Sequence, residues 1–184
     1  MSEARKMTGP KSDEWSAEKL GNLQRRVKRL QDEDWDFRSY LKDLDYDRVD
    51  AAVWRLLGTA SAEVNCRKCN NCCRELHPQL SDRDIARLAK GLGMAPKDFS
   101  KRYLVEDDDE PGMHRMREMP CPFLDRKGCA HYDLRPDDCR SFPHLGKKGF
   151  LSRSMSVISN QGVCPIVFNV YQRLKSELWN RHGR

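Results

Sequence analysis

The central stretch of the chain, residues 66–73, carries four cysteines at a CxxCxxCC spacing. Thiolate sulfur is a soft ligand, and closely spaced cysteines hold both structural zinc and iron–sulfur clusters in proteins. A chain that turns every three residues brings successive sulfurs to one side of a tight loop, so we expect these thiols to converge. The spacing therefore predicts a metal site on Cys66, Cys69, Cys72 and Cys73.

Four more cysteines follow in the second half of the chain, each in a setting rich in turns. The prolines on either side of Cys121 and the one after Cys164 remove backbone donors and stiffen the backbone, which favours loops that hold ligands in place. Pro136 is expected to begin a short helical turn that presents Cys139, and Cys164 is expected at the start of a helix whose dipole favours its thiolate. These additional candidate ligands are Cys121, Cys129, Cys139 and Cys164.

Length, composition and charge restrict the class of protein. With 184 residues, of which 38% are hydrophobic and 34% charged, the chain is expected to form one core with an attached arm. No stretch has the length of a membrane span and no secretory signal is evident, so we expect a cytoplasmic protein with reduced thiols and no membrane contact. The net charge of +6 is concentrated after His144, and a solvated basic face is preferred over nucleic-acid binding.

Apolar residues at helical spacing dominate the region before the cysteine run. Three such stripes predict three amphipathic helices within residues 12–62, which we interpret as an N-terminal helical extension following a flexible terminus at 1–11. This extension could cover the metal domain or contact a partner protein through its tryptophans. The stripes begin at Leu20, Phe37 and Val49, and the tryptophans are Trp15, Trp35 and Trp54.

Local signals also divide the segment after the cysteine run. Ser81 and Asp84 are spaced as a capping box before an apolar helical face, and Pro96 suits the start of a second helix. Alternating patterns predict strands at 113–119 and 150–158, with at most one small strand pair, and a last helix begins at Pro165. The expected fold is mainly α with a small β-hairpin, in which residues 63–184 form an irregular cysteine-rich metal-binding domain.

Several ordered motifs together resemble a known family. Besides the cysteine run, the chain contains Cys-Pro-Phe-Leu at 121–124, Arg-Pro at 135–136, Cys-Arg at 139–140 and a late Cys-Pro at 164–165. In these motifs, across residues 64–166, the chain resembles the YkgJ-like CxxCxxCC cysteine-cluster family of zinc- or iron-chelating domain proteins. The resemblance implies a small metal- or iron–sulfur-binding domain. Related domains occur in flagellin lysine N-methylases, so an accessory or catalytic part in modifying another protein is a further reading, and whether the chain is an enzyme stays open.

The choice of metal rests on ligand number and spacing. Eight thiolates match two four-coordinate zinc sites or two clusters, and one cluster with spare cysteines is a third arrangement. The second half lacks the CxxC knuckle of a zinc ribbon, so the pattern favours iron, as an iron–sulfur cluster with a redox or metal-handling role. Structural zinc in an interaction module is the alternative. One departure from the family is His131, which could support a ligand or simply pack in the fold.

Overall fold

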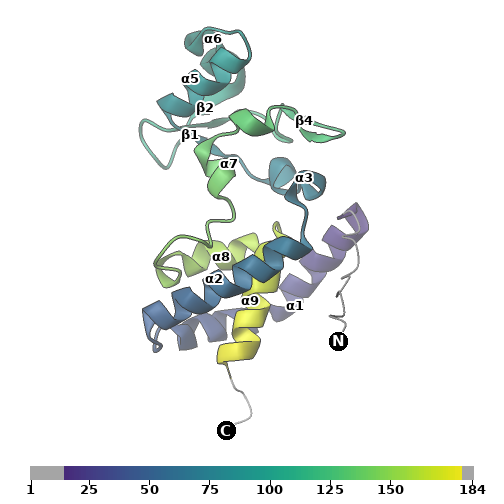
Figure 1. Cartoon of the computed structure of the whole chain (residues 1–184), viewed down its shortest axis with the longest axis vertical. Coiled ribbons are helices and arrows are strands. Elements are labelled where there is room, and N and C mark those ends of the chain that lie inside the picture. Colours follow the sequence, from purple (N-terminus) through teal and green to yellow (C-terminus); the bar gives the residue numbers. More distant parts are fainter. Residues whose placement is uncertain (1–14, 180–184) are drawn as a thin grey trace, which may run out of the picture.

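The computed structural model describes residues 15–179, so the predicted flexible terminus at 1–11 lies outside them. The predicted fold class is confirmed, because the described chain is mainly α-helical with only short antiparallel strands. Figure 1 shows a helical bundle at one end and a smaller lobe at the other, with α3 and α7 between them. No described helix is long and apolar enough to cross a membrane.

The N-terminal extension folds as two helices rather than the predicted three. Helix α1 runs from Ala17–Leu41 and α2 from Tyr46–Glu63. The first two predicted stripes belong to α1, because nothing between them breaks the helix. Asp45 separates the two helices, and its carboxylate accepts a 2.8 Å hydrogen bond from the backbone N–H of Arg48, which caps α2.

Two C-terminal helices complete the bundle, α8 (Ser154–Asn160) and α9 (Pro165–Leu178). The predicted strand at 150–158 is wrong, because this segment forms the 3₁₀ turn η2 (Leu151–Arg153) and then α8. Its buried residues are Ser154, Val157 and Ile158, which share one face of a helix. A short apolar run fits the two-residue period of a strand and the 3.6-residue period of a helix equally well. Here, packing against α9 favours the helix. The predicted last helix is confirmed.

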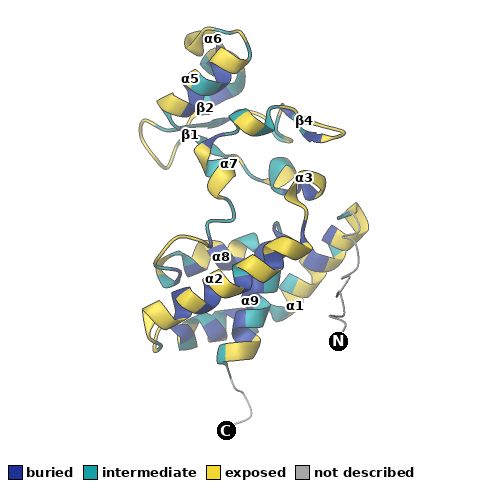
Figure 2. Ribbon diagram, in the orientation of Figure 1, coloured by how far each residue is buried: buried dark blue, intermediate teal, exposed yellow. Residues whose placement is uncertain are grey.

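The bundle shares a single apolar core between the extension and the C-terminal helices. Phe37 and Val49 of the extension are fully buried together with Val170 and Tyr171 of α9. Figure 2 shows this buried face along the inside of the helices. Two of the tryptophans, Trp15 and Trp35, pack against the same core, whereas Trp54 is exposed. The residues before the cysteine run therefore fold together with those after it.

A polar network lies inside this apolar bundle. Asp34 is fully buried, and its carboxylate accepts hydrogen bonds from Gln161 at 2.8 Å and from the ammonium group of the buried Lys175 at 2.5 Å. Gln172 donates to the same carboxylate, and the Tyr171 hydroxyl donates to the Asp34 carbonyl at 2.8 Å. A buried charge is tolerated only when it is paired and hydrogen-bonded, so α1, α8 and α9 are fixed to one another at this point.

The small lobe, residues 76–134, is built on helices α5 (Asp82–Gly91) and α6 (Pro96–Tyr103). Both helices were predicted with these starts. They pack over a sheet in the order β1-β3-β2, and fully buried Leu80, Ala89 and Phe99 lie in its core. The strands are β1 (Gln79–Leu80), β2 (Leu104–Glu106) and β3 (His114–Met116).

The strand content exceeds the single pair predicted. β3 lies within the predicted strand at 113–119 and pairs with β1 and β2, and a separate hairpin joins β4 (Leu124–Asp125) to β5 (Gly128–Cys129). Strands of two or three residues carry too little sequence for an alternating pattern to be visible. Their pairing is decided by the helices that cover them.

Asp84 gives the small lobe a pH-dependent contribution to stability. The capping box is present, because Asp84 accepts from the N–H and hydroxyl of Ser81. Burial acts to raise the pKa of Asp84, but these bonds, the Asp137 N–H and the Arg87 charge hold it below its ordinary value. A carboxyl with a lowered folded-state pKa stabilises the fold above its unfolded pKa and loses that effect as the pH falls through the folded one.

We therefore expect Asp84→Asn to lower the free energy of unfolding at pH 7, and we expect this difference to shrink as the pH falls below the unfolded pKa of about 3.9 and through the lower folded pKa. Urea unfolding of both proteins across pH 2–8 measures this difference. Asp82→Asn, at an exposed position of the same first turn, is the matched control. A difference that stays constant with pH would contradict the assignment.

Candidate metal centre

The cysteine run folds as two single helical turns separated by a reversal. Helix α3 spans Cys66–Cys69 and α4 spans Cys72–Glu75. Asn70 ends α3 in the left-handed region, at φ 50°, and its side-chain amide donates to the Arg67 carbonyl at 2.9 Å. Asparagine tolerates this conformation better than most residues, so the chain can turn between the second and third cysteines.

Two cysteines of the small lobe are brought to the second of these turns. The Cys121 N–H donates to the Cys73 carbonyl at 2.8 Å, which joins the two segments directly. The β4–β5 hairpin then places Cys129 opposite Leu124, three residues after Cys121. Cys121 and Cys129 both pack against the core of the small lobe.

Gly128 sets how closely the hairpin approaches α3. Its φ is +113°, and a Cβ at this position would lie 2.8 Å from the Arg67 carbonyl oxygen and 3.3 Å from Oδ1 of Asn70. Only glycine adopts this backbone conformation without strain, and only a residue without a Cβ fits against the Arg67 carbonyl.

We expect Gly128→Ala to destabilise the protein by about 2 kcal/mol or more, because strain at positive φ and the backbone clash add together. It should also weaken metal retention, since the hairpin carries Cys129. Chemical denaturation and metal analysis of the same preparations measure both effects. Gly58→Ala in α2, where a Cβ meets nothing within 4 Å, is the control and should be neutral or slightly stabilising.

The last two cysteines reach the site from different elements. Cys139 lies in α7 (Asp137–Ser141), which begins after Pro136 as predicted and is fixed to β1 by a 3.1 Å bond from the Gln79 N–H to Asp138. Cys164 precedes α9, and the loop before it is held by the Asn71 amide, which donates to the Val163 carbonyl at 2.8 Å. That bond spans 92 residues of sequence.

Electrostatic coupling connects all eight thiols. Besides burial, which is the largest cause for most of them, neighbouring thiols raise the pKa of each cysteine except Cys73. Burial followed by the charges of Cys73 and Cys129 raises the pKa of Cys121 to about 11. Burial followed by the charges of Cys73, Asp138 and other thiols raises that of Cys139 to about 12. The charge of each thiol acts on at least one other, so each predicted residue lies within electrostatic range of a neighbouring thiol, a longer range than metal ligation requires.

Packing separates the thiols into two groups that remain electrostatic neighbours. Cys69 and Cys164 are buried in the core of the bundle, and Cys66 and Cys72 interact with Cys164. We call this group the bundle-side set: Cys66, Cys69, Cys72 and Cys164. Cys121 and Cys129 pack against the core of the small lobe, and both interact with Cys73 and Cys139. We call that group the lobe-side set: Cys73, Cys121, Cys129 and Cys139. The charge of Cys73 also acts on Cys66, Cys69 and Cys72, and that of Cys139 acts on Cys72, so the two sets adjoin.

The adjacent cysteines Cys72 and Cys73 join the two sets. A hydrogen bond between their side chains raises the pKa of Cys72 and lowers that of Cys73. The two thiols therefore titrate as a pair, in which the first proton is lost more easily than the second, because the remaining thiol stabilises the thiolate by a hydrogen bond. A metal ligand must be deprotonated, and the pair supplies one thiolate more readily than two isolated buried thiols would.

The expected thiolate at Cys164 is not supported. The N–H groups of Ile166 and Val167 at the start of α9 act to lower its pKa, as the dipole argument requires. Burial in the bundle core is the larger effect and raises the pKa of Cys164 to about 12. Ligation at this position requires a metal to displace the proton.

The donor set fits a soft metal. All eight cysteines are free thiols, and thiolate sulfur is the ligand type of zinc and iron–sulfur sites. Within residues 15–179, no three His, Cys, Asp or Glu side chains stand close enough to hold an ion as they are placed. The fit therefore lies in the chemistry and assembly of the donors, and coordination requires the cysteine side chains to rotate towards a common centre.

Two arginines place positive charge beside the thiols. Arg135 acts to lower the pKa of Cys66, Cys73 and Cys129, and Arg74 acts to lower that of Cys69 and Cys73. The Arg135 guanidinium lies 3.5 Å from the ring centroid of Tyr132. Its Nε and Nη1 are buried without a hydrogen-bond partner among the described residues. These charges offset the negative charge of clustered thiolates.

Sequence reasoning missed two residues that hold the cysteine loops, Asn70 and Asn71. An Asn-Asn pair between cysteines is a signal for a helix end in the left-handed region, and it could have identified Asn70. Asn71 acts through a contact distant in sequence and left no local signal. The close approach of Gly128 to the Arg67 carbonyl is likewise decided by the fold. The imidazole of His131 packs edge-to-face on Phe123, with 5.4 Å between ring centroids, which is a packing role.

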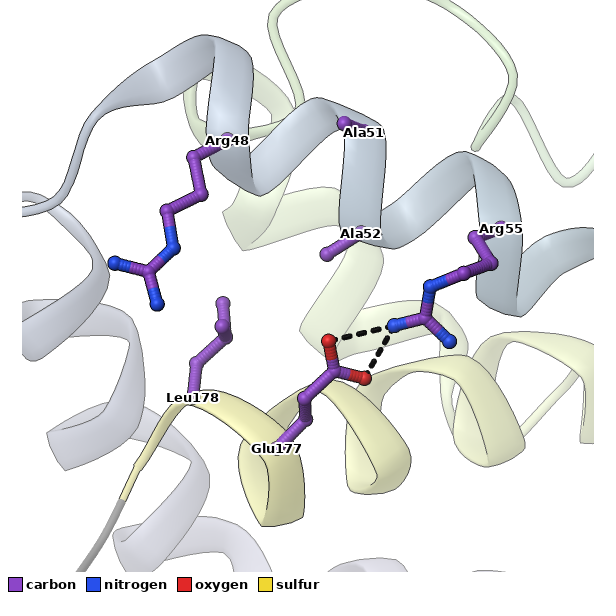
Figure 3. Close-up of a pocket in the computed structure, with 6 residues that line it drawn as sticks. All are labelled: Arg48, Ala51, Ala52, Arg55, Glu177 and Leu178. Carbon is purple, nitrogen blue, oxygen red and sulfur yellow. Dashed lines mark hydrogen bonds and ion pairs between the residues drawn. The ribbon is translucent and has the colours of Figure 1, made fainter.

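A groove of about 370 Å³ lies between α2 and α9. Figure 3 shows the Arg55 guanidinium bonded to the Glu177 carboxylate across it, with Arg48 at the other end. Its lining contains no cysteine or histidine. The groove therefore takes no part in thiolate chemistry, and the candidate site is the cysteine region.

Comparison with known proteins agrees with this site. A family model described as "CxxCxxCC: Putative zinc- or iron-chelating domain" matches residues 65–165, more than half of the 184-residue chain. The match begins immediately before Cys66 and ends immediately after Cys164, so it contains all eight cysteines. No curated protein and no solved structure matched the chain. The chain belongs to the CxxCxxCC family of zinc- or iron-chelating domains.

Proposed function

We propose that this protein binds metal through its eight cysteines in two adjacent centres, one on each set defined above, and that the metal is iron held in iron–sulfur clusters. The observation that carries the proposal is the assembly of eight free thiols from five separate segments into one region. Four thiolates per centre satisfy the coordination of either a cluster or a zinc ion. The protein then serves a redox or metal-handling task in a reducing compartment such as the cytoplasm.

The packing supports two centres rather than one. The bundle-side set lies against the bundle core through Cys69 and Cys164, and the lobe-side set lies against the other core through Cys121 and Cys129. The peptide bond between Cys72 and Cys73 links the two sets. A metal in each set would attach one lobe to the α3–α4 segment, so that metal binding and folding stabilise each other.

Iron is favoured by the spacing and by the second half of the chain. Cys66, Cys69 and Cys72 follow the CxxCxxC pattern of ferredoxin-type ligation. The other cysteines do not form the second CxxC pair of a zinc ribbon. Arg74 and Arg135 beside the thiols suit a centre that carries excess negative charge, as both a tetrathiolate zinc site and a thiolate-bound cluster do, so they support a metal centre without selecting the metal.

Metal and sulfide analysis after purification under anaerobic conditions tests the proposal. We expect a brown protein with broad visible absorbance, iron, and an equal amount of acid-labile sulfide. Colourless protein that carries stoichiometric zinc after both aerobic and anaerobic purification would establish the alternative, a structural-zinc interaction module. Several short elements around the thiols, such as α3, α4 and β5, favour that alternative because they have little core of their own.

A further inference from the structure

One edge of the cysteine region is open to solvent. Of the eight cysteines, all of which lie within the described residues, Cys66 alone is exposed. It is the first residue of α3, and the next two residues, Arg67 and Lys68, are exposed as well. Cys66 is therefore the member of the bundle-side set that another molecule reaches most directly from solvent.

A second pair of cations reaches the same edge from the small lobe. Arg126 and Lys127 are exposed in the turn of the β4–β5 hairpin. The next residue, Gly128, lies against the Arg67 carbonyl, so the turn rests on α3, and Figure 1 shows the hairpin beside α3. The basic edge, defined as Arg67, Lys68, Arg126 and Lys127, is therefore formed by two segments distant in sequence.

These cations are not the ones that balance the thiols. The positive charges that act most strongly on the cysteines are Arg74 and Arg135. Among the described residues, no ion pair involves a member of the basic edge. The nearest carboxylate in the turn, Asp125, accepts a 2.6 Å bond from the Lys127 N–H. Four positive charges with one such carboxylate leave a net positive field around Cys66.

We propose that the basic edge around Cys66 is the docking surface for an acidic protein that exchanges metal or electrons with the cysteine site. This inference rests on the proposed metal-binding function. Complementary charge steers a partner to a site and sets its orientation, and a short-lived exchange complex needs little more than this. Docking also costs these cations little, since no internal ion pair has to break.

The chemistry of the edge favours a protein over nucleic acid. Binding of a single-stranded nucleic acid requires exposed aromatic rings on which bases stack. The aromatic ring next to the edge is Tyr132, and it is already covered by Arg67, at 4.5 Å from its centroid, and by Arg135. The cations also form a compact group around one cysteine rather than a track along a groove.

Metal extraction by chelators of different charge tests the proposal on the full-length, metal-loaded protein. Rates of metal removal are measured with EDTA, which is anionic, and with phenanthroline, which is uncharged. The ratio of the EDTA rate to the phenanthroline rate is then determined at increasing salt concentrations. We expect Lys68→Glu/Lys127→Glu to lower this ratio by on the order of tenfold at 10 mM ionic strength. The effect should fall below about twofold at 1 M salt, where the Debye length is only about 3 Å.

The control carries the same change of charge elsewhere. Lys42→Glu/Lys97→Glu reverses one exposed lysine after α1 and one in α6, and it should leave the ratio within about twofold of the unmodified protein. Equal effects of both variants would mean that net charge alone acts, and this would overturn the proposal. RNA oligonucleotides are tested for binding as well. If they bind in a salt-sensitive way and only Lys68→Glu/Lys127→Glu loses this binding, the edge is assigned to nucleic acid and the proposal is overturned.

A second measurement separates this inference from the proposed function. In metal-free protein, Cys66 is modified by dithiobis-nitrobenzoate, an anionic disulfide, and by dithiodipyridine, an uncharged one. Both reagents react with the thiolate, so the ratio of their rates at one pH does not depend on the fraction of Cys66 that is ionised. If the protein purifies without metal, the proposed function fails. The ratio of the two modification rates still reports the electrostatic field at Cys66. If Lys68→Glu/Lys127→Glu leaves that ratio unchanged, the proposed basic edge is rejected.

Discussion

Cys69→Ser is expected to remove about half of the bound metal and to lower the melting temperature by on the order of 10 °C or more. Cys69 is buried against the bundle core and belongs to the bundle-side set. Serine oxygen is a poor ligand for a soft metal, so a four-thiolate centre with one serine loses much of its affinity. Binding energy at such centres is also folding energy, and metal content and stability should fall together.

Cys129→Ser is the matched substitution in the lobe-side set. Two centres predict that each single variant retains about half of the metal and that the double variant retains almost none. Metal analysis and thermal denaturation are measured on the same samples, and circular dichroism at low temperature confirms that the helices remain. Metal content that is unchanged in Cys69→Ser would contradict ligation by this residue. Complete loss in both single variants would favour one shared cluster.

Asp34→Ala is expected to destabilise the protein by about 3–5 kcal/mol, because it leaves the ammonium group of Lys175 buried without its closest partner. For a chain of this size, that corresponds to a fall in melting temperature of roughly 6–20 °C. Gln161 and Gln172 also lose the acceptor that they share. Urea or thermal unfolding measures the loss.

The matched control removes both charges. Asp34→Ala/Lys175→Met also removes the buried cation, whose remaining partner in the single variant is the partly exposed Glu33 at 3.4 Å, and fills its space with an apolar side chain, so it should recover at least half of the lost stability. Gln161 lies three residues before Cys164, and for this reason Asp34→Ala should also reduce metal retention at the bundle-side set. Equal instability of the single and double variants would show that the buried charge is not the cause.

The sequence was most informative where structure is local. Ser81 and Asp84 form the predicted capping box, and Pro96 and Pro165 begin helices as predicted. These signals act within one turn of a helix, so all the residues that interact are close together in the sequence. The prediction failed at 150–158, where a few apolar residues fit a strand and a helix equally well and contacts with α9 made the choice.

What the sequence determined by itself is the chemistry of the protein. Eight cysteines, four of them at CxxCxxCC spacing, the family to which the chain belongs, and a mainly helical fold all follow from residue types and short spacings. The tertiary structure decided which thiols pack against which core, that Cys164 is buried, and that the N-terminal helices share a core with α8 and α9. These features depend on contacts such as the bond from Asn71 to Val163, which joins residues 92 positions apart. Periodicity and local propensity describe only near neighbours, so the grouping of the cysteines into two sets emerged only when the chain was folded.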